Sequence, residues 1–228
     1  MSDRSPDTQD TPLEATQNAE INTTRRKLTG AGLGASAIFT LASRPVLAGV
    51  CQSPSAAVSG NLSQHGTPTT CSGRSPGYWK EHPEEWPTAT YAPGTATNPD
   101  PTGNGNGYKN KAENWSGGTL FHPLFSGGLF KADLDKNPST ANTSLSMMQV
   151  MQLNNGSNPW GLTDPDNLGA HIVAALLNAV TGKTTGVLSD TQVINMWNEW
   201  VSKGYFEPTA GVRWTSANIV TYIVSTFS

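Results

Sequence analysis

The chain has few charged side chains, and this shortage narrows the range of its partners. Charged residues make up 14% of its 228 positions, and no cluster of lysine and arginine occurs after residue 48. A protein that binds nucleic acid or an anionic membrane surface normally carries such a cluster. We therefore expect neither of them as a partner.

The chain also lacks a long hydrophobic run. Its most apolar N-terminal stretch, residues 28–43, has sixteen mildly apolar residues, whereas a membrane-spanning helix needs roughly 20. This stretch follows Arg25 and Arg26, and it precedes small residues that end at Ala48. The pattern is typical of a twin-arginine (Tat) signal peptide cleaved after Ala48.

Two alternatives to this signal fit less well. A membrane anchor would need a longer apolar run, and a lipoprotein signal would need a small residue where Val50 precedes Cys51. The sequence thus predicts a signal peptide over 1–48 and the Tat translocase as a partner during export. The mature protein is expected in the periplasm or outside the cell, with no stable membrane span.

Only two cysteines occur, Cys51 and Cys71, and both belong to the expected mature chain. They lack the C-x-x-C spacing of many metal and redox sites. Because exported proteins meet an oxidising compartment, a disulfide between them is the favoured prediction. Closing a loop of that size contributes about 3 kcal/mol in the chain-entropy model.

The mature chain of 180 residues is long enough for one domain with a core. It holds twelve acidic and nine basic side chains, for a net charge of −3. Residues 49–70 are predicted to be an irregular arm, followed by a single, mainly α, irregular helical domain over 71–228. A long polar loop is expected at 88–118.

Capping signals predict the main helices. A short buried helix is expected within 144–153, and a longer one at 165–181 between the Asp164-Pro165 start signal and Gly182. A capping box at 189–192 opens a predicted helix over 190–203, which Gly204 ends. A last helix is expected at 216–227, with Ser216 as its cap.

The densest chemical signal is the aromatic segment, residues 71–87, which reads CSGRSPGYWKEHPEEWP. It resembles a motif of secreted bacterial proteins, C-x-G-x-x-P-G-Y-W-K-x-H-P-x-x-W-P. In those relatives an apolar helical region of the LxxHxxAALLNA type follows, and residues 168–179 read LGAHIVAALLNA. The group has no established activity, so the resemblance implies a domain and a compartment and no catalytic residue.

Within the aromatic segment, Pro76-Gly77 predicts a turn with a positive φ at the glycine. Rigid aromatic side chains beside a polar loop suit a binding surface, since they lose little conformational entropy on binding. The candidate binding residues are Tyr78, Trp79, His82, Trp86 and Trp115, with a carbohydrate or another envelope component as ligand. The competing hypothesis is that the tryptophans are buried and only support the core.

A catalytic alternative is a secreted hydrolase that acts on glycans or cell-wall material through Glu84 and Glu85. Adjacent carboxylates on a helical turn point in different directions, and no serine or cysteine nucleophile motif is present. We therefore favour a non-catalytic binding or structural module over an enzyme.

We expect no metal and no cofactor. The four histidines, His65, His82, His122 and His171, lack the spacing of zinc sites. Oxygen-bearing side chains alternate over 100–106 and 133–137, but the twelfth positions are Lys111 and Ser144 instead of glutamate, and Pro138 stands where the second stretch would need a glycine. These differences exclude an EF-hand calcium loop and leave an irregular calcium site as the alternative.

Overall fold

The computed structural model describes residues 51–59, 69–98, 107–126, 131–132, 144–156 and 158–228. The predicted signal peptide with Arg25, Arg26 and Ala48 lies outside these residues, as do His65 and both of the oxygen-rich stretches, 100–106 and 133–137. All described residues belong to one compact unit, 45–228. They are mainly helical, which confirms the coarse fold prediction.

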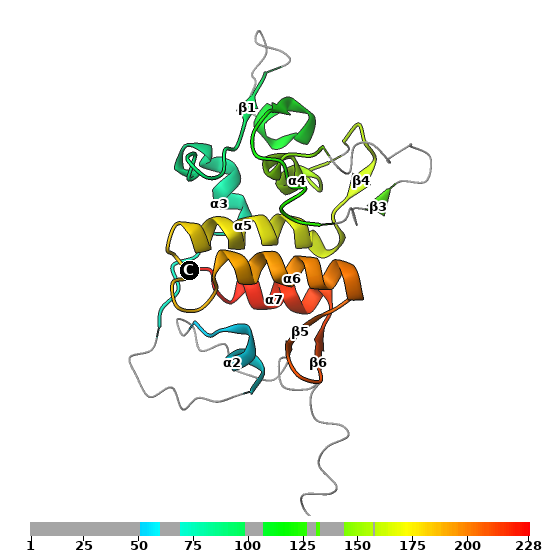
Figure 1. Cartoon of the computed structure of the whole chain (residues 1–228). Coiled ribbons are helices and arrows are strands. Elements are labelled where there is room, and N and C mark those ends of the chain that lie inside the picture. The colour runs from blue at the N-terminus through cyan, green and yellow to red at the C-terminus, as the bar shows by residue number, and fades with distance from the viewer. Residues whose placement is uncertain (1–50, 60–68, 99–106, 127–130, 133–143, 157) are drawn as a thin grey trace, which may run out of the picture. The chain divides into compact units, whose positions relative to one another are not determined.

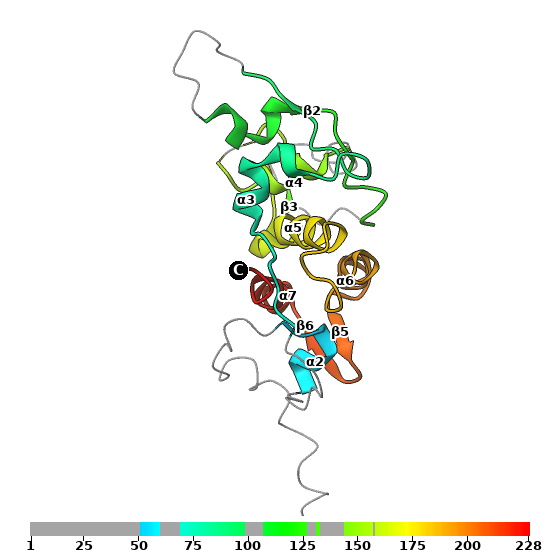
Figure 2. The same cartoon turned by 90° about the vertical axis from the view of Figure 1, so that its left-hand side faces the viewer.

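Helix α5, Leu168–Val180, is the centre of the core. Every residue from Leu168 to Asn178 is buried except His171, because apolar side chains occupy nearly the whole circumference of this helix. It contacts α3, α4, α6 and α7, and Figures 1 and 2 show these helices placed around it. A helix that is apolar all round must be covered on all sides, and α5 is.

Helices α6 (Asp190–Lys203) and α7 (Ser216–Val224) flank α5. The capping box at Ser189 and the left-handed Gly204, with φ 77°, set the two ends of α6 as predicted. The cap of α7 is Thr215 rather than Ser216, because its hydroxyl accepts the hydrogen bond from the Asn218 N–H. Helix α7 also ends earlier than predicted.

Two shorter helices pack on the opposite side of α5: α3 (Pro76–Glu81) and α4 (Met147–Gln152). Helix α2 (Pro54–Ser59) occupies part of the region predicted to be an irregular arm, which corrects that prediction. The described residues also include short 3-10 helices: η1 (Pro83–Glu85), η2 (Tyr108–Asn110), η3 (Ala112–Asn114) and η5 (Pro165–Asn167).

Within the part of the chain that the structure describes, the strands form three antiparallel pairs, none of which was predicted. They are β1 (Thr95–Ala96) with β2 (Trp115–Ser116), β3 (Lys131–Ala132) with β4 (Leu162–Thr163), and β5 (Phe206–Thr209) with β6 (Val212–Trp214). The first pair lies in the region predicted to be a long loop, 88–118. Within the described ranges, no helix combines the length and apolar character that crossing a bilayer requires.

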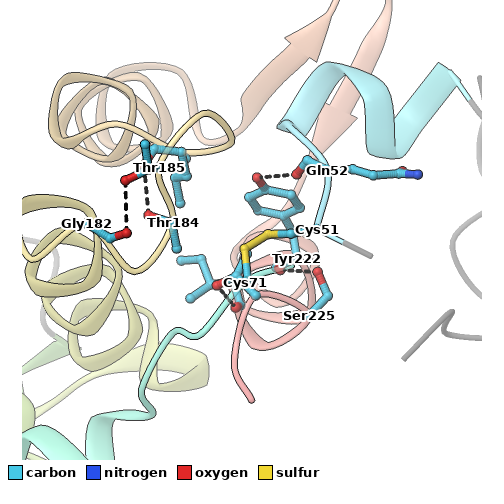
Figure 3. The surroundings of a disulfide bond; sticks show 11 residues. Cys51, Gln52, Cys71, Gly182, Thr184, Thr185, Tyr222 and Ser225 are labelled. Atoms are coloured by element: carbon cyan, nitrogen blue, oxygen red, sulfur yellow. Dashed lines mark hydrogen bonds between the residues drawn. A yellow bond between two sulfur atoms is a disulfide. The ribbon is translucent and has the colours of Figure 1, made fainter. Parts of the chain in front are cut away.

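The predicted disulfide between Cys51 and Cys71 is present and joins the residues before α2 to those before α3. Figure 3 shows Tyr222 of α7 beside this bond, and its hydroxyl donates to the carbonyl of Gln52 over 2.9 Å. The C-terminus lies nearby, because Gly73 N–H donates to Thr226 O and Ser228 N–H donates to Gly73 O. These contacts tie both ends of the described chain to the start of the aromatic segment.

Candidate functional site

Helix α3 carries most of the aromatic segment. Ser75 caps it by accepting from the Tyr78 N–H, and Pro76 occupies its first turn, where no backbone N–H is needed. Gly77 is therefore helical, and the predicted turn with a positive φ is wrong. The start signal of a short helix and that of a Pro-Gly turn are alike, and here the serine cap decides between them.

The two tryptophans of the segment face inward. The exposed fractions of Trp79 and Trp86 are 0% and 3%. Trp79 Nε1 donates to Asn178 Oδ1 of α5 over 3.1 Å, and Trp86 Nε1 donates to Trp79 O over 2.9 Å. A buried indole that finds a hydrogen-bond partner is a stable core group. Both rings are thus part of the core.

Trp115 of β2 is also buried, with 3% of its surface exposed. Its Nε1 donates to Lys109 O over 2.8 Å, and its carbonyl accepts from Gln149 of α4 over 2.9 Å. The predicted binding surface is therefore corrected in this respect: three of its five residues are covered by the protein and offer no ring face to a ligand. Local sequence does not reveal which way an aromatic ring points.

Five other residues of the segment form a surface that we call the outer face of α3: Arg74, Tyr78, His82, Glu84 and Glu85. The Tyr78 hydroxyl donates to Glu85 Oε1 over 2.6 Å, and His82 Nδ1 lies 3.0 Å from Glu84 Oε1. The Tyr78 ring centroid is 4.4 Å from that of His82 and 4.7 Å from Arg74 Cζ. These contacts hold the five side chains in one arrangement.

The electrostatics of this face do not favour glycoside hydrolysis. That reaction needs one carboxyl group that stays protonated to act as general acid. Hydrogen bonds from its own backbone N–H and from His82 lower the pKa of Glu84. Glu85 is bound to Tyr78, and its carboxylate raises the pKa of the Tyr78 hydroxyl. The two glutamates thus have separate partners, and both are exposed.

The described histidines are placed apart. His82 lies on the outer face of α3, and His122 contacts the carbonyl of Phe125 through Nδ1. His171 Nδ1 lies 2.8 Å from Asn167 O, and burial lowers the pKa of this histidine. Within the described ranges, no group of three or more His, Cys, Asp or Glu side chains is close enough to hold a metal ion.

Asp164 is the most perturbed acidic group among the described residues. It is 3% exposed, and burial raises its pKa to about 6. Its Oδ1 and Oδ2 accept from the N–H groups of Gly169 and Ala170, both over 2.9 Å. The sequence predicted Asp164 as a helix cap, and it indeed satisfies the first turn of α5 from four residues upstream. This role is structural.

Asn178 was missed by the sequence analysis. Its Oδ1 accepts from the Arg74 N–H over 2.8 Å as well as from Trp79, and its Nδ2 donates to Arg74 O over 2.9 Å. The available signal was an amide in an otherwise apolar helix, which needs partners when it is buried.

No family model, curated protein or solved structure matches this chain.

Proposed function

We propose that the mature chain is an exported, non-catalytic module that contacts another component of the cell envelope through the outer face of α3. The observation that carries this proposal is that some side chains of the aromatic segment lie in the core and others lie on the surface. Trp79 and Trp86 are buried and hydrogen-bonded inside the protein, whereas Tyr78, His82 and the two glutamates lie on its surface. The segment thereby displays a fixed polar surface on a rigid base.

A surface of this kind suits binding for an entropic reason. Side chains already held by hydrogen bonds and ring contacts lose little freedom when a partner arrives. The outer face also carries two carboxylates, Glu84 and Glu85, that can accept further hydrogen bonds. A glycan of the envelope, which is rich in hydroxyl donors, is the partner class that fits it best.

Two further observations support the proposed compartment. The twin arginines Arg25 and Arg26 precede an apolar run and a small-residue cleavage motif at Ala48. The Cys51–Cys71 disulfide is of the kind that persists in oxidising compartments such as the periplasm. Both support export by the Tat pathway.

Export is tested by changing Arg25 and Arg26 together to lysine in the full-length chain. The Tat receptor reads the arginine pair as an address, so mature protein should no longer accumulate outside the cytoplasm. N-terminal sequencing of the exported wild type should begin at residue 49. Normal export of the doubly substituted chain would contradict the Tat route.

Binding is tested with the exported protein on immobilised envelope glycans. An outer-face variant combines Tyr78→Ala, Glu84→Gln and Glu85→Gln, and a control variant combines Thr191→Ala, Asn195→Ala and Ser202→Ala on α6. We expect the wild type and the control to be retained and the outer-face variant to elute. Equal retention of all three, or of none, would contradict the proposal. If the wild type releases sugar from the glycans and a folded Glu84→Gln or Glu85→Gln variant does not, the protein is instead a hydrolase.

A further inference from the structure

The residues that follow α4 bring an asparagine, a glycine and a lysine together. Asn155 is directly followed by Gly156, and both are exposed. In an Asn-Gly pair the backbone nitrogen of the glycine can attack the asparagine side-chain carbon, because no Cβ hinders the five-membered ring that forms. Gly156 has φ 109°, and a Cβ built on it would meet nothing within 4 Å. No neighbouring group therefore crowds the glycine at its Cα.

Lys80 of α3 lies against the reacting amide. Its Nζ donates to Asn155 Oδ1 over 3.3 Å, while the Asn155 Nδ2 donates to Gln152 Oε1. Attack on the side-chain carbon places negative charge on Oδ1, and an ammonium group beside that oxygen stabilises the charge as it develops. Lys80 is half-buried, so its charge is less screened than that of a fully exposed lysine.

We propose that Asn155 is a self-modification site, at which the fold promotes cyclisation and deamidation with Lys80 as the oxyanion-stabilising group. The Gly156 nitrogen bonds to Asn155 Cγ and gives up its proton to solvent. The Nδ2 group takes up a proton from solvent, the bond from Cγ to Nδ2 breaks, and ammonia leaves. Water then opens the succinimide at either carbonyl, which yields aspartate or isoaspartate at position 155.

The product would change the contact between α3 and the residues after α4. In the aspartate product, a carboxylate replaces the neutral amide of Asn155, so the hydrogen bond from Lys80 becomes a charge-assisted one. This product therefore adds a negative charge beside Lys80 of α3 and keeps the contact between Lys80 and position 155. The inference does not depend on the proposed function.

Asn154 is the matched internal control. It is exposed like Asn155 but is followed by an asparagine instead of a glycine. Its side chain is held by Asp164 and Asn167, with Nδ2 to Asp164 O at 2.7 Å and the Asp164 N–H to Oδ1 at 2.9 Å. We expect no modification at this neighbour under conditions that convert Asn155.

The test is peptide mapping by mass spectrometry of exported protein incubated at mildly alkaline pH, folded and in urea. We expect the exchange of an amide for a hydroxyl at position 155, with both isomers present, several-fold faster in the folded protein than in urea. Lys80→Met should abolish this acceleration, whereas Asn155→Gln should abolish the product. Circular dichroism establishes that both variants are folded.

Three results would overturn the proposal. Asn155 could stay intact in folded protein while it converts in urea, which would mean that the fold protects it. The Lys80→Met variant could react as fast as the wild type, so that the lysine has no part in the reaction. Loss of one ammonia without gain of water, in a peptide that joins positions 80 and 155, would show an amide cross-link to Lys80 instead.

Discussion

Trp79 Nε1 donates a hydrogen bond to Asn178 Oδ1, and the two residues lie 99 positions apart in the chain. Both are fully buried, with 0% of their surface exposed. The same Asn178 side chain binds the N–H and the carbonyl of Arg74. The aromatic segment is therefore docked on α5 through one amide that satisfies three polar groups.

Replacing this amide should be costly. Asn178→Ala leaves the Trp79 indole N–H and both backbone groups of Arg74 without their partner, and we expect a loss of about 3 kcal/mol in unfolding free energy. Asn195→Ala, an exposed change on α6, is the control and should stay within about 0.5 kcal/mol of wild type. Urea unfolding measures both. Equal effects in the two variants would contradict the docking role of Asn178.

Two glycines of the aromatic segment should respond oppositely to the same substitution. A Cβ on Gly73 would lie 2.6 Å from Thr226 O, so Gly73→Ala should destabilise the protein by about 2 kcal/mol. A Cβ on Gly77 meets only Ser75 Oγ, at 3.6 Å, and α3 is helical there, so Gly77→Ala should stabilise by about 0.5 kcal/mol. Thermal unfolding distinguishes them. A destabilised Gly77→Ala would refute the helical conformation.

The disulfide should contribute to stability through the loop that it closes. Replacing Cys51 and Cys71 together by serine should lower the unfolding free energy by about 3 kcal/mol. The Tyr222 contact to Gln52 remains available in the variant, so the fold should persist. Alkylation of exported wild-type protein before reduction should label neither cysteine, and two labelled thiols would show that the bridge is absent.

The buried carboxyl group of Asp164 should make the unfolding free energy depend on pH. Its pKa is raised from 3.8 to about 6 by burial, so the folded protein holds this proton more tightly than the unfolded chain does. The stabilisation is complete below the unfolded pKa and is lost as the pH rises through about 6. The shift of about two pKa units corresponds to about 3 kcal/mol.

The measurement is the difference in unfolding free energy between wild type and Asp164→Asn as a function of pH. The unfolding free energy of the wild type minus that of the variant should fall between about pH 4 and about pH 7. Asparagine does not titrate, and the other groups are common to both proteins. A difference that stays constant or rises over this window would contradict the assignment.

Elements of the fold were predictable where the sequence pattern that sets them acts on residues next to it in the chain. Helix α6 was predicted to its ends because the Ser189 capping box and Gly204 act on their own neighbours. Helix α5 begins three residues later than predicted, since Asp166 and Asn167 have φ values of 55° and 56° and form no regular helix. The strands β5 and β6 were missed, because Pro208 within β5 makes its sequence atypical of a strand.

The candidate site was less predictable than the helices. The aromatic segment was recognised from its composition, whereas the helix that begins at Pro76 was predicted to be a turn. The side to which Trp79 and Trp86 point depends on Asn178 and on the packing against α5, which lie about a hundred residues away in the sequence. The contacts of Tyr78 with Glu85 and of His82 with Glu84 depend likewise on the exact geometry of α3 and η1.

Trp79 and Trp86 of the aromatic segment belong to the core, and its polar residues face outward. Hydroxyl-radical footprinting of folded protein, read by mass spectrometry, measures the reactivity of each tryptophan separately. Trp79, Trp86 and Trp115 should react slowly, as should the buried Trp197 and Trp214, while the half-buried Trp160 and Trp200 should react fastest. Reactivity of Trp79 and Trp86 equal to that of Trp160 and Trp200 would contradict the account and restore the aromatic binding surface.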